Sequence, residues 1–209
     1  MTINQTFVLG PIENNSYVLY DENSRQAWII DPAMEPAPLV DFLEKHQFTL
    51  EKVLITHGHF DHYYGLPYLQ KMLTTPFAVY LHPEDLALWQ SGGGASHFWG
   101  QSLEVPKPTK LLTDGARLSL GETELIVLHT PGHSPGSVTF YCPSMATAYC
   151  GDLIFFHGIG RTDLDGGSFT DIQTSIKQKI FTLPENVTLL PGHGPATTVG
   201  EEINNNPYL

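Results

Sequence analysis

The chain has 209 residues, 41% of them hydrophobic, which is enough apolar material for one domain with a real core. Its formal net charge is -12, with 10 Lys and Arg against 22 Asp and Glu. A chain with this balance offers no basic surface to a phosphate backbone or to an anionic membrane, so nucleic acid and membranes are excluded as expected partners. We expect residues 1–209 to form a single domain that acts on a small molecule.

The two cysteines and the N-terminus predict the compartment. Cys142 and Cys150 lie in separate apolar stretches and form no Cys-x-x-Cys pair, so they predict neither a disulfide framework nor a thiolate metal site. The first residues, MTINQTFVLGPIENN, lack the basic and apolar regions of an export signal, and no window approaches an unbroken transmembrane run. These features predict a cytoplasmic protein that does not span a membrane.

The N-terminal half begins with strands and then alternates strand and helix. Short apolar runs between turn residues predict an antiparallel meander of three strands, over residues 6–9, 16–20 and 27–31. The hydrophobic period then predicts a helix over 36–47, a strand over 52–56, a helix over 63–73, a strand over 77–81 and a short helix opened by Pro83. The Gly-, Ser- and Pro-rich residues 91–108 follow, and we interpret them as a loop that could cover an active site.

The C-terminal half repeats this plan. Strands are predicted over 111–112, 117–120, 124–129, 138–142, 148–154 and 187–190, with a helix over 169–181. Two β-rich halves that each end in helix predict an α+β fold, an αββα sandwich of two mixed β-sheets flanked by helices.

The stretch THGHFDH, residues 56–62, carries His57, His59, Asp61 and His62 directly after an apolar run. A polar turn at the end of a strand needs one or two such residues. Four potential ligands separated only by Gly58 and a phenylalanine therefore favour a metal site.

Three further candidates each follow a predicted strand: His133, Asp152 and His193. Glycine and proline surround them, in the segments PGH, GD and PGH. Loops at one edge of a pair of sheets can converge on a point. A single Gly-His or Gly-Asp is usually only a turn, so these residues become candidate ligands through their combination with the first cluster.

These motifs together resemble the ligand set of the metallo-β-lactamase-fold hydrolases, from the N-terminal region as far as His193. The segment GDLIFFHGIGRTDL and the ending PGHGPATTVGEEINNNPYL are similar to small, single-domain glyoxalase II-like (hydroxyacylglutathione hydrolase-like) enzymes. The resemblance implies one metal held by His57, His59 and His133, and a second held by Asp61, His62 and His193. It also implies that Asp152 bridges the two metals.

The chemistry of the donors agrees with that division. Imidazoles and carboxylates suit two divalent metal ions, zinc first, with iron or manganese also tolerated. Two such cations can hold a hydroxide ready to attack a carbonyl, with Asp61 orienting it. The resemblance therefore implies a thioesterase that cleaves S-(2-hydroxyacyl)glutathione such as S-lactoylglutathione.

Arg161 and His157 are candidate substrate-binding residues in the segment FHGIGRTD. Larger glyoxalase II enzymes place a basic residue in the similar loop to hold the glycine carboxylate of glutathione. An internal ion pair of Arg161 with Asp163 or Asp165 is an equally simple prediction. The helical C-terminal domain of the larger enzymes is not expected here, which leaves the glutathione half of the site under-specified.

The remaining histidines have ordinary interpretations. His129 could pack at a strand end or donate a hydrogen bond to a metal ligand. His82 is predicted to be a surface residue at the end of a helix, and His97 belongs to the loop 91–108.

Several other functions remain open. A lactonase or another small-ester hydrolase would use the same nucleophile. A mononuclear iron persulfide dioxygenase resembles this fold and represents another reaction class. A non-enzymatic metal-binding module would need a closed set of ligands. A β-lactamase is disfavoured by the lack of an export signal, and a nuclease by the lack of a basic groove. The sequence does not specify the metals, the acyl group or the oligomeric state.

Overall fold

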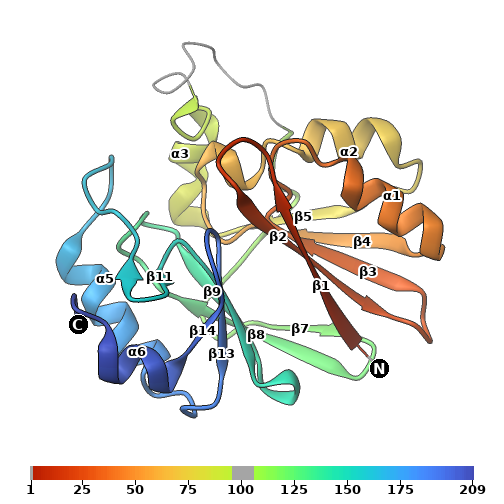
Figure 1. The fold of residues 1–209 in the computed structure, drawn as a ribbon. Helices are drawn as coiled ribbons and strands as arrows, with labels where there is room; N and C mark the ends of the chain where they lie inside the picture. The colour runs from red at the N-terminus through yellow and green to blue at the C-terminus, as the bar shows by residue number, and fades with distance from the viewer. Residues whose placement is uncertain (1, 96–105) are drawn as a thin grey trace.

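Two six-stranded sheets pack face to face, and helices cover the outer face of each sheet (Figure 1). The structure is a computed structural model that describes residues 2–95 and 106–209. The predicted loop 91–108 therefore lies largely outside the described residues. The αββα sandwich with two mixed sheets is confirmed.

The first sheet has the order β1-β2-β3-β4-β5-β6. Its strands are β1 (Thr2–Leu9), β2 (Asn14–Asp21), β3 (Gln26–Ile30), β4 (Thr49–Leu54), β5 (Ala78–Leu81) and β6 (Lys110–Leu111). The pairs β1–β2 and β2–β3 are antiparallel, as the predicted meander requires, and β3 to β6 are parallel. The helices of this half are α1 (Ala37–His46), α2 (Leu66–Met72) and α3 (Leu86–Gln90).

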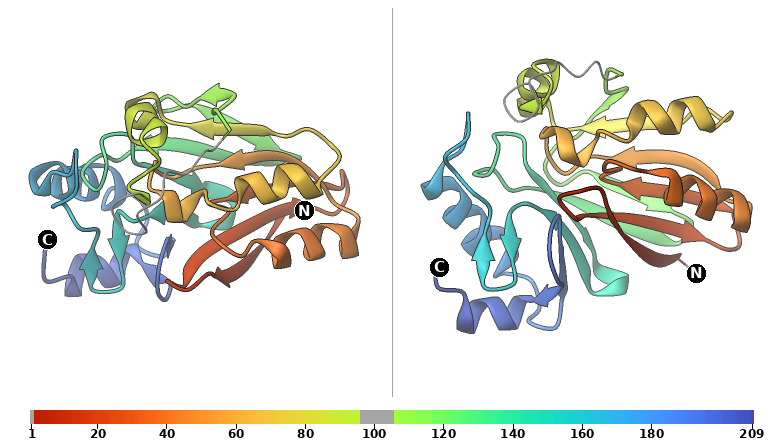
Figure 2. Two further views of the ribbon diagram at one scale, coloured as in Figure 1. Left: turned by 90° about the horizontal axis from the view of Figure 1, so that it is seen from above. Right: turned by 45° about the horizontal axis from the view of Figure 1, so that its top comes forward.

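The second sheet has the order β14-β13-β10-β9-β8-β7. Its strands are β7 (Arg117–Leu120), β8 (Thr123–His129), β9 (Val138–Cys142), β10 (Thr147–Gly151), β13 (Thr188–Pro191) and β14 (Thr197–Thr198). A separate hairpin consists of β11 (Ile154–Phe155) and β12 (Gly158–Ile159). Helix α5 (Phe169–Ser175), its π-helical continuation η4 (Ile176–Ile180) and α6 (Val199–Asn205) cover this half, and Figure 2 shows the helices of the two halves on opposite outer faces.

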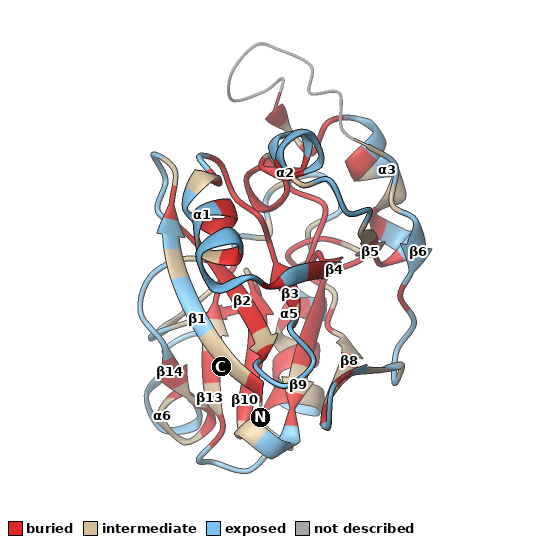
Figure 3. Ribbon diagram, turned by 90° about the vertical axis from the view of Figure 1, so that its right-hand side faces the viewer, coloured by how far each residue is buried: buried red, intermediate tan, exposed pale blue. Residues whose placement is uncertain are grey.

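The hydrophobic core has three layers because the central strands bury both of their faces (Figure 3). On β4, Val53 packs toward the first set of helices, whereas its neighbour Leu54 packs between the sheets. Successive side chains of a strand point to opposite faces, so this alternation joins the two layers through one strand. The third layer lies between the second sheet and α5, where Ile172 packs with Leu189.

Two predicted elements have different bounds in the structure. The predicted strand 148–154 is broken, because β10 ends at Gly151, whose φ of 51° leaves the extended region, and β11 begins at Ile154. The predicted helix 63–73 begins at Leu66, since the preceding residues form the 3-10 turn η1 (Phe60–His62). Within residues 2–95 and 106–209, none of the helices is long and apolar enough to span a bilayer.

The topology brings several strand ends to one edge. Strands β8, β10 and β13 run in the same direction, so their C-terminal ends share one edge of the second sheet. The end of β4 in the first sheet meets the same edge, because the amide of Val138 donates to the carbonyl of Thr56 over 2.8 Å. The amide of Asn15 likewise donates to the carbonyl of Gly192 over 2.7 Å. The loops after these four strands therefore lie together.

Candidate metal centre

Seven potential ligands from four loops meet at this edge. The loop after β4 supplies His57, His59, Asp61 and His62, and the turn η1 directs the last two back toward the sheets. The β8–β9 loop supplies His133, the turn after β10 supplies Asp152, and the turn after β13 supplies His193. The structure therefore brings together every residue that the sequence predicts as a ligand.

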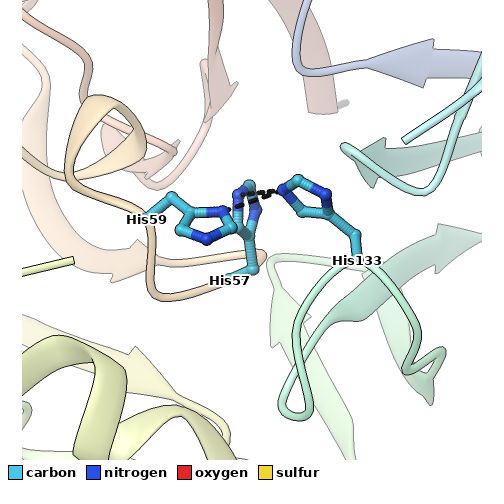
Figure 4. Close-up of side chains that lie close together, drawn as sticks. All are labelled: His57, His59 and His133. Atoms are coloured by element: carbon cyan, nitrogen blue, oxygen red, sulfur yellow. Dashed lines mark hydrogen bonds between the residues drawn. The ribbon is translucent and has the colours of Figure 1, made fainter. Parts of the chain in front are cut away.

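The first group consists of His57, His59 and His133 (Figure 4). The Nε2 atom of His133 lies 2.8 Å from Nδ1 of His59 and 3.2 Å from Nε2 of His57. Two nitrogens that share a tetrahedral zinc ion lie about 3.3 Å apart. The three rings meet edge to face, at interplanar angles of 73° to 83°, so their in-plane lone pairs can converge.

The second group consists of Asp61, His62 and His193. The Oδ2 atom of Asp61 lies 3.4 Å from Nε2 of His62 and 3.3 Å from Nε2 of His193. The side-chain amide of Asn14 donates to the same oxygen over 2.9 Å. Two ring nitrogens and a carboxylate oxygen thus face one point.

Asp152 lies between the two groups. Its Oδ2 atom is 3.6 Å from Nε2 of His133 in the first group and 3.8 Å from Nε2 of His193 in the second. Its Oδ1 atom is 3.4 Å from Nε2 of His62. One carboxylate therefore faces both groups, which is the arrangement that a bridging ligand requires.

The donor atoms fit divalent cations. Both His62 Nε2 and Asp152 Oδ1 are buried without a hydrogen-bond partner within the described part of the chain. Orphaned buried polar atoms are costly, and a cation would satisfy this pair. Gly192 makes room for them, since a Cβ there would overlap Asp152 Oδ1 and lie 2.5 Å from Cε1 of His62.

A pocket of about 190 Å³ opens over both groups. Its floor contains Asp61 and Asp152, and its walls include the apolar side chains of Ile12, Phe60 and Leu164. A molecule in the pocket would therefore contact ligands of both groups while its apolar part packs against the wall.

The comparison with known families decides the membership. Residues 9–193 match the model of the metallo-β-lactamase superfamily, a span that includes all seven ligands. The chain belongs to this superfamily. The fold of this superfamily, together with the His/Asp groups, indicates that the protein binds divalent metal.

Two relatives match the sequence over nearly the whole length of the chain. A probable metallo-hydrolase of Bacillus subtilis, YqgX, is 37% identical and the match covers 96% of this chain and 94% of that protein. The hydroxyacylglutathione hydrolase GloC of Haemophilus influenzae is 31% identical, over 94% of this chain and 93% of that protein.

Two solved structures are similar in fold and sequence. The BLEG-1 B3 metallo-β-lactamase superposes with a TM-score of 0.90 at 38% identity, covering 99% of each chain. A di-iron-bound form of TTHA1623 superposes with a TM-score of 0.87 at 38% identity, covering 98% of this chain and 100% of that one. The second structure shows that a protein similar to this chain in fold and sequence can hold iron.

Hydrogen bonds fix the orientation of three histidine rings in the candidate metal centre. Nδ1 of His62 donates to Asp31 over 2.9 Å, Nδ1 of His133 donates to the carbonyl of Arg161 over 2.8 Å, and Nδ1 of His193 donates to the carbonyl of Ile12 over 3.1 Å. Because each oxygen can only accept, each Nδ1 carries a proton, which leaves Nε2 as the nitrogen that can bind a cation at the centre.

The sequence prediction missed these partners. Asp31 follows an apolar strand in the segment IIDP, so it offered a signal in its position at a strand end. Backbone carbonyls offer none, because every residue has one.

The electrostatics of the two ligand groups differ. Burial, followed by the neighbouring histidines, lowers the pKa of His59 to about 4 and holds the pKa of His57 well below its ordinary value. Burial also disfavours the charged form of His62, but the carboxylates of Asp61, Asp152 and Asp31 outweigh it and raise the pKa of His62. His57 and His59 are thus neutral and ready to bind a cation, whereas the carboxylates around His62 favour its protonated form in the metal-free protein.

Arg161 lies at the rim of the pocket with its side chain exposed. Its Nε and Nη2 atoms donate to the two carboxylate oxygens of Asp163 over 2.7 and 2.8 Å. The internal ion pair that the sequence allowed is therefore present, and the residue also borders the pocket.

His157 is not brought to the pocket. Its ring contacts Glu201 on α6, with Nε2 2.7 Å from Oε1, and stacks on Phe156 at a centroid distance of 3.9 Å. The hairpin β11–β12 turns this side chain toward the C-terminal helix, so its predicted contact with substrate is not supported by its placement.

His82 is buried rather than exposed, so the surface prediction was wrong. Its ring stacks on that of His129, at 4.1 Å between centroids and 15° between planes. His129 places Nε2 2.9 Å from the carbonyl of Pro135 and donates its backbone amide to Asp114. Its contacts are those of a packing residue, and together with His82 and Glu84 it forms a further group of ligand-type residues.

Proposed function

We propose that the chain is a dinuclear metal-dependent hydrolase of small thioesters, with S-(2-hydroxyacyl)glutathione such as S-lactoylglutathione as its substrate class. The observation that carries the proposal is the position of Asp152 between two ligand groups on the floor of one pocket. The likeness to GloC, a hydroxyacylglutathione hydrolase, over 94% of this chain supports a thioester as the substrate.

The residues that would hold the metals are those of the two groups. His57, His59 and His133 would hold one ion, Asp61, His62 and His193 the other, and Asp152 would bridge them. Zinc suits this donor set, and iron or manganese would also be accommodated. When bound, two such cations supply a water of lowered pKa as the nucleophile and a Lewis acid for the carbonyl oxygen.

Asp61 is placed to orient the attacking water. Its carboxylate borders the pocket, and although burial opposes ionisation, the neighbouring side chains of His62, His193 and Asn14 keep its pKa well below the ordinary value. It therefore remains an acceptor at neutral pH. A carboxylate in that state can accept the hydrogen bond of a water molecule directed at the acyl carbonyl.

Arg161 is the residue proposed to recognise a carboxylate of the thiol half. Asp163 fixes its guanidinium at the pocket rim through Nε and Nη2. Within residues 2–95 and 106–209, no hydrogen bond engages Nη1. That edge of the guanidinium could bind a carboxylate that extends out of the small pocket.

β-Lactam hydrolysis is a second candidate because BLEG-1, a B3 metallo-β-lactamase, is 38% identical over 99% of this chain. It would use the same attack on a carbonyl. The two candidates differ in the leaving group and in the use of Arg161.

Steady-state kinetics with a substrate panel tests the proposal. Protein loaded with zinc and, separately, with iron is assayed with S-lactoylglutathione, a simple lactone, a β-lactam, and glutathione persulfide with an oxygen electrode. We expect kcat/KM for the thioester to exceed that for the lactone and the β-lactam by about a hundredfold. A preference for the β-lactam, or oxygen uptake without thioester cleavage, would refute the thioesterase.

Arg161→Ala supplies an internal control in that panel. It should raise KM for S-lactoylglutathione about tenfold with little change in kcat, because a charge-assisted hydrogen bond is lost. An uncharged lactoyl thioester should be unaffected. An equal rise in KM for both thioesters would show that Arg161 forms only a structural ion pair.

A further inference from the structure

Asp85 is a fully buried carboxylate that belongs to neither ligand group. It occupies the N-cap position of α3, where an aspartate normally accepts a hydrogen bond from its own helix. Its side chain makes no such bond. The carboxylate is instead directed at the loops that carry the first group of histidines.

Three short hydrogen bonds join Asp85 to those loops. Oδ2 accepts from the amide of Gly58 over 2.7 Å and from the hydroxyl of Ser134 over 2.7 Å. Oδ1 accepts from the amide of Gly136 over 2.6 Å. Gly58 lies between His57 and His59, and Ser134 follows His133 directly, so one carboxylate links the two loops of the three-histidine group.

The backbone of both loops approaches Asp85 closely. A Cβ at position 136 would lie 2.6 Å from the amide nitrogen of Asp85 and 2.7 Å from its Cγ. A Cβ at position 58 would lie 3.2 Å from the Cβ of Asp85. Glycine at both positions therefore allows the carboxylate to reach the amide groups, which is independent support for a built contact.

We propose that Asp85 is a positioning residue that fixes the separation of the His57/His59 loop from the His133 loop and thereby sets the metal affinity of that group. The proposal rests on the metal centre that the proposed function requires. The ligand nitrogens are 2.8 and 3.2 Å apart. Apart from the bond from the amide of Val138 to the carbonyl of Thr56 at the base of the two loops, the hydrogen bonds that join their described backbone run through the carboxylate of Asp85. Looser loops would let these nitrogens separate.

The alternative is that Asp85 is only a structural carboxylate, and the chain contains a matched control. Glu202 on α6 is also fully buried and accepts from the backbone amide of His157, the hydroxyl of Thr197 and the side-chain amide of Asn206. It joins segments that carry no ligand. Asp85→Asn and Glu202→Gln each keep the size of the side chain and remove one acceptor.

Zinc affinity is measured for both variants by competition with a chromophoric chelator, in the wild-type chain and in a His193→Ala background. That background removes a ligand from the second group, so the three-histidine group is observed alone. We expect Asp85→Asn to weaken zinc binding there about tenfold, and Glu202→Gln to leave it unchanged. The midpoint temperature of thermal unfolding, recorded in parallel, should fall for both variants.

Unchanged affinity in Asp85→Asn, or an equal loss in Glu202→Gln, would overturn the proposal. If Asp85→Asn does not fold, Ser134→Ala replaces it, removing one of the three bonds, and should weaken zinc binding by about two- to threefold. The measurement needs no thioester. Tight zinc binding by the wild type without thioester cleavage would therefore reject the proposed function while leaving the role of Asp85 intact.

Discussion

The three-histidine group and the stacked pair of His82 and His129 differ in the geometry of their rings. In the three-histidine group the rings of His57, His59 and His133 meet at 73° to 83°. In the other group, His82 and His129 stack at 15°, with Glu84 beside them. An imidazole binds a metal through a lone pair in the plane of its ring, so edge-to-face rings can aim their lone pairs at one point, whereas two rings stacked face to face aim theirs along separate planes.

The difference originates in what holds each ring. In the three-histidine group, Nδ1 of His133 donates to the carbonyl of Arg161, so its Nε2 points inward. In the second ligand group, oxygens of Asp31 and Ile12 hold His62 and His193 in the same way. His129 instead uses Nε2 itself, with the carbonyl of Pro135 2.9 Å away. Residue type alone therefore does not specify a metal centre. The oxygen that accepts a hydrogen bond from one ring nitrogen decides which nitrogen remains to bind a metal.

The largest expected effect comes from removing the ligand that joins the two metal groups. Asp152→Ala should lower thioester hydrolysis by about a thousandfold, since several kcal/mol of charge stabilisation depend on the paired site. Metal content per chain, measured by elemental analysis, should fall with it. A variant that keeps full occupancy and turnover would show that Asp152 does not bridge.

Removing a residue that holds a ligand in place, rather than the ligand itself, should have an intermediate effect on metal binding. Asp31 accepts from Nδ1 of His62 over 2.9 Å and from the amide and hydroxyl of Thr56 over 2.8 and 2.6 Å. Asp31→Asn should weaken zinc binding about 10- to 100-fold in chelator competition. Asp114→Asn is the control, because Asp114 accepts from the backbone of His129 in the stacked group, and it should leave zinc affinity unchanged.

The stacked group should be separable from metal binding. The double variant His82→Ala with His129→Ala should keep wild-type metal content and kcat. Its free energy of unfolding should fall by at least the worth of an aromatic pair, about 0.5–1.5 kcal/mol. Denaturant titration beside elemental analysis checks both statements, and a loss of bound metal would place the stack within the centre.

The smallest effect is a pH dependence within the stacked group. Burial, and then His129, lowers the pKa of His82 below its ordinary 6.5, although Glu84, Asp85 and Asp114 oppose the shift. The unfolded chain therefore takes up this proton at higher pH than the folded protein. Stability from neutral His82 is present above pH 6.5 and is lost as the pH falls toward the folded pKa.

A single variant measures that contribution. Between about pH 7.5 and 5.5, the unfolding midpoint of the wild type should fall more steeply than that of His82→Gln. Equal slopes would contradict the shift.

Much of the fold followed from the hydrophobic pattern. The meander β1–β3 and the strand β4 were predictable because short apolar runs are bounded by turn residues. The apolar run over residues 148–154 looked like one strand, and only the left-handed φ of Gly151 in the structure separates β10 from β11. The pattern of hydrophobic residues along the sequence does not reveal such a turn.

The candidate site was predictable as far as residue type and strand ends allow. His133, Asp152 and His193 stood out by their glycine neighbours, and the structure brings them to His57 and Asp61. The hydrogen bonds from Asp85 to the two ligand loops were not predictable, because an aspartate before a helix ordinarily caps that helix. The surface prediction for His82 failed because the ends of β5 and β8 pack together, a contact between segments far apart in sequence.

The central claim is that both ligand groups act together. We would titrate zinc into metal-free protein and follow the rate of S-lactoylglutathione hydrolysis against equivalents bound per chain. The account predicts that full activity is reached only when a second equivalent binds. Saturation at one equivalent, or hydrolysis independent of zinc and of iron, would contradict it.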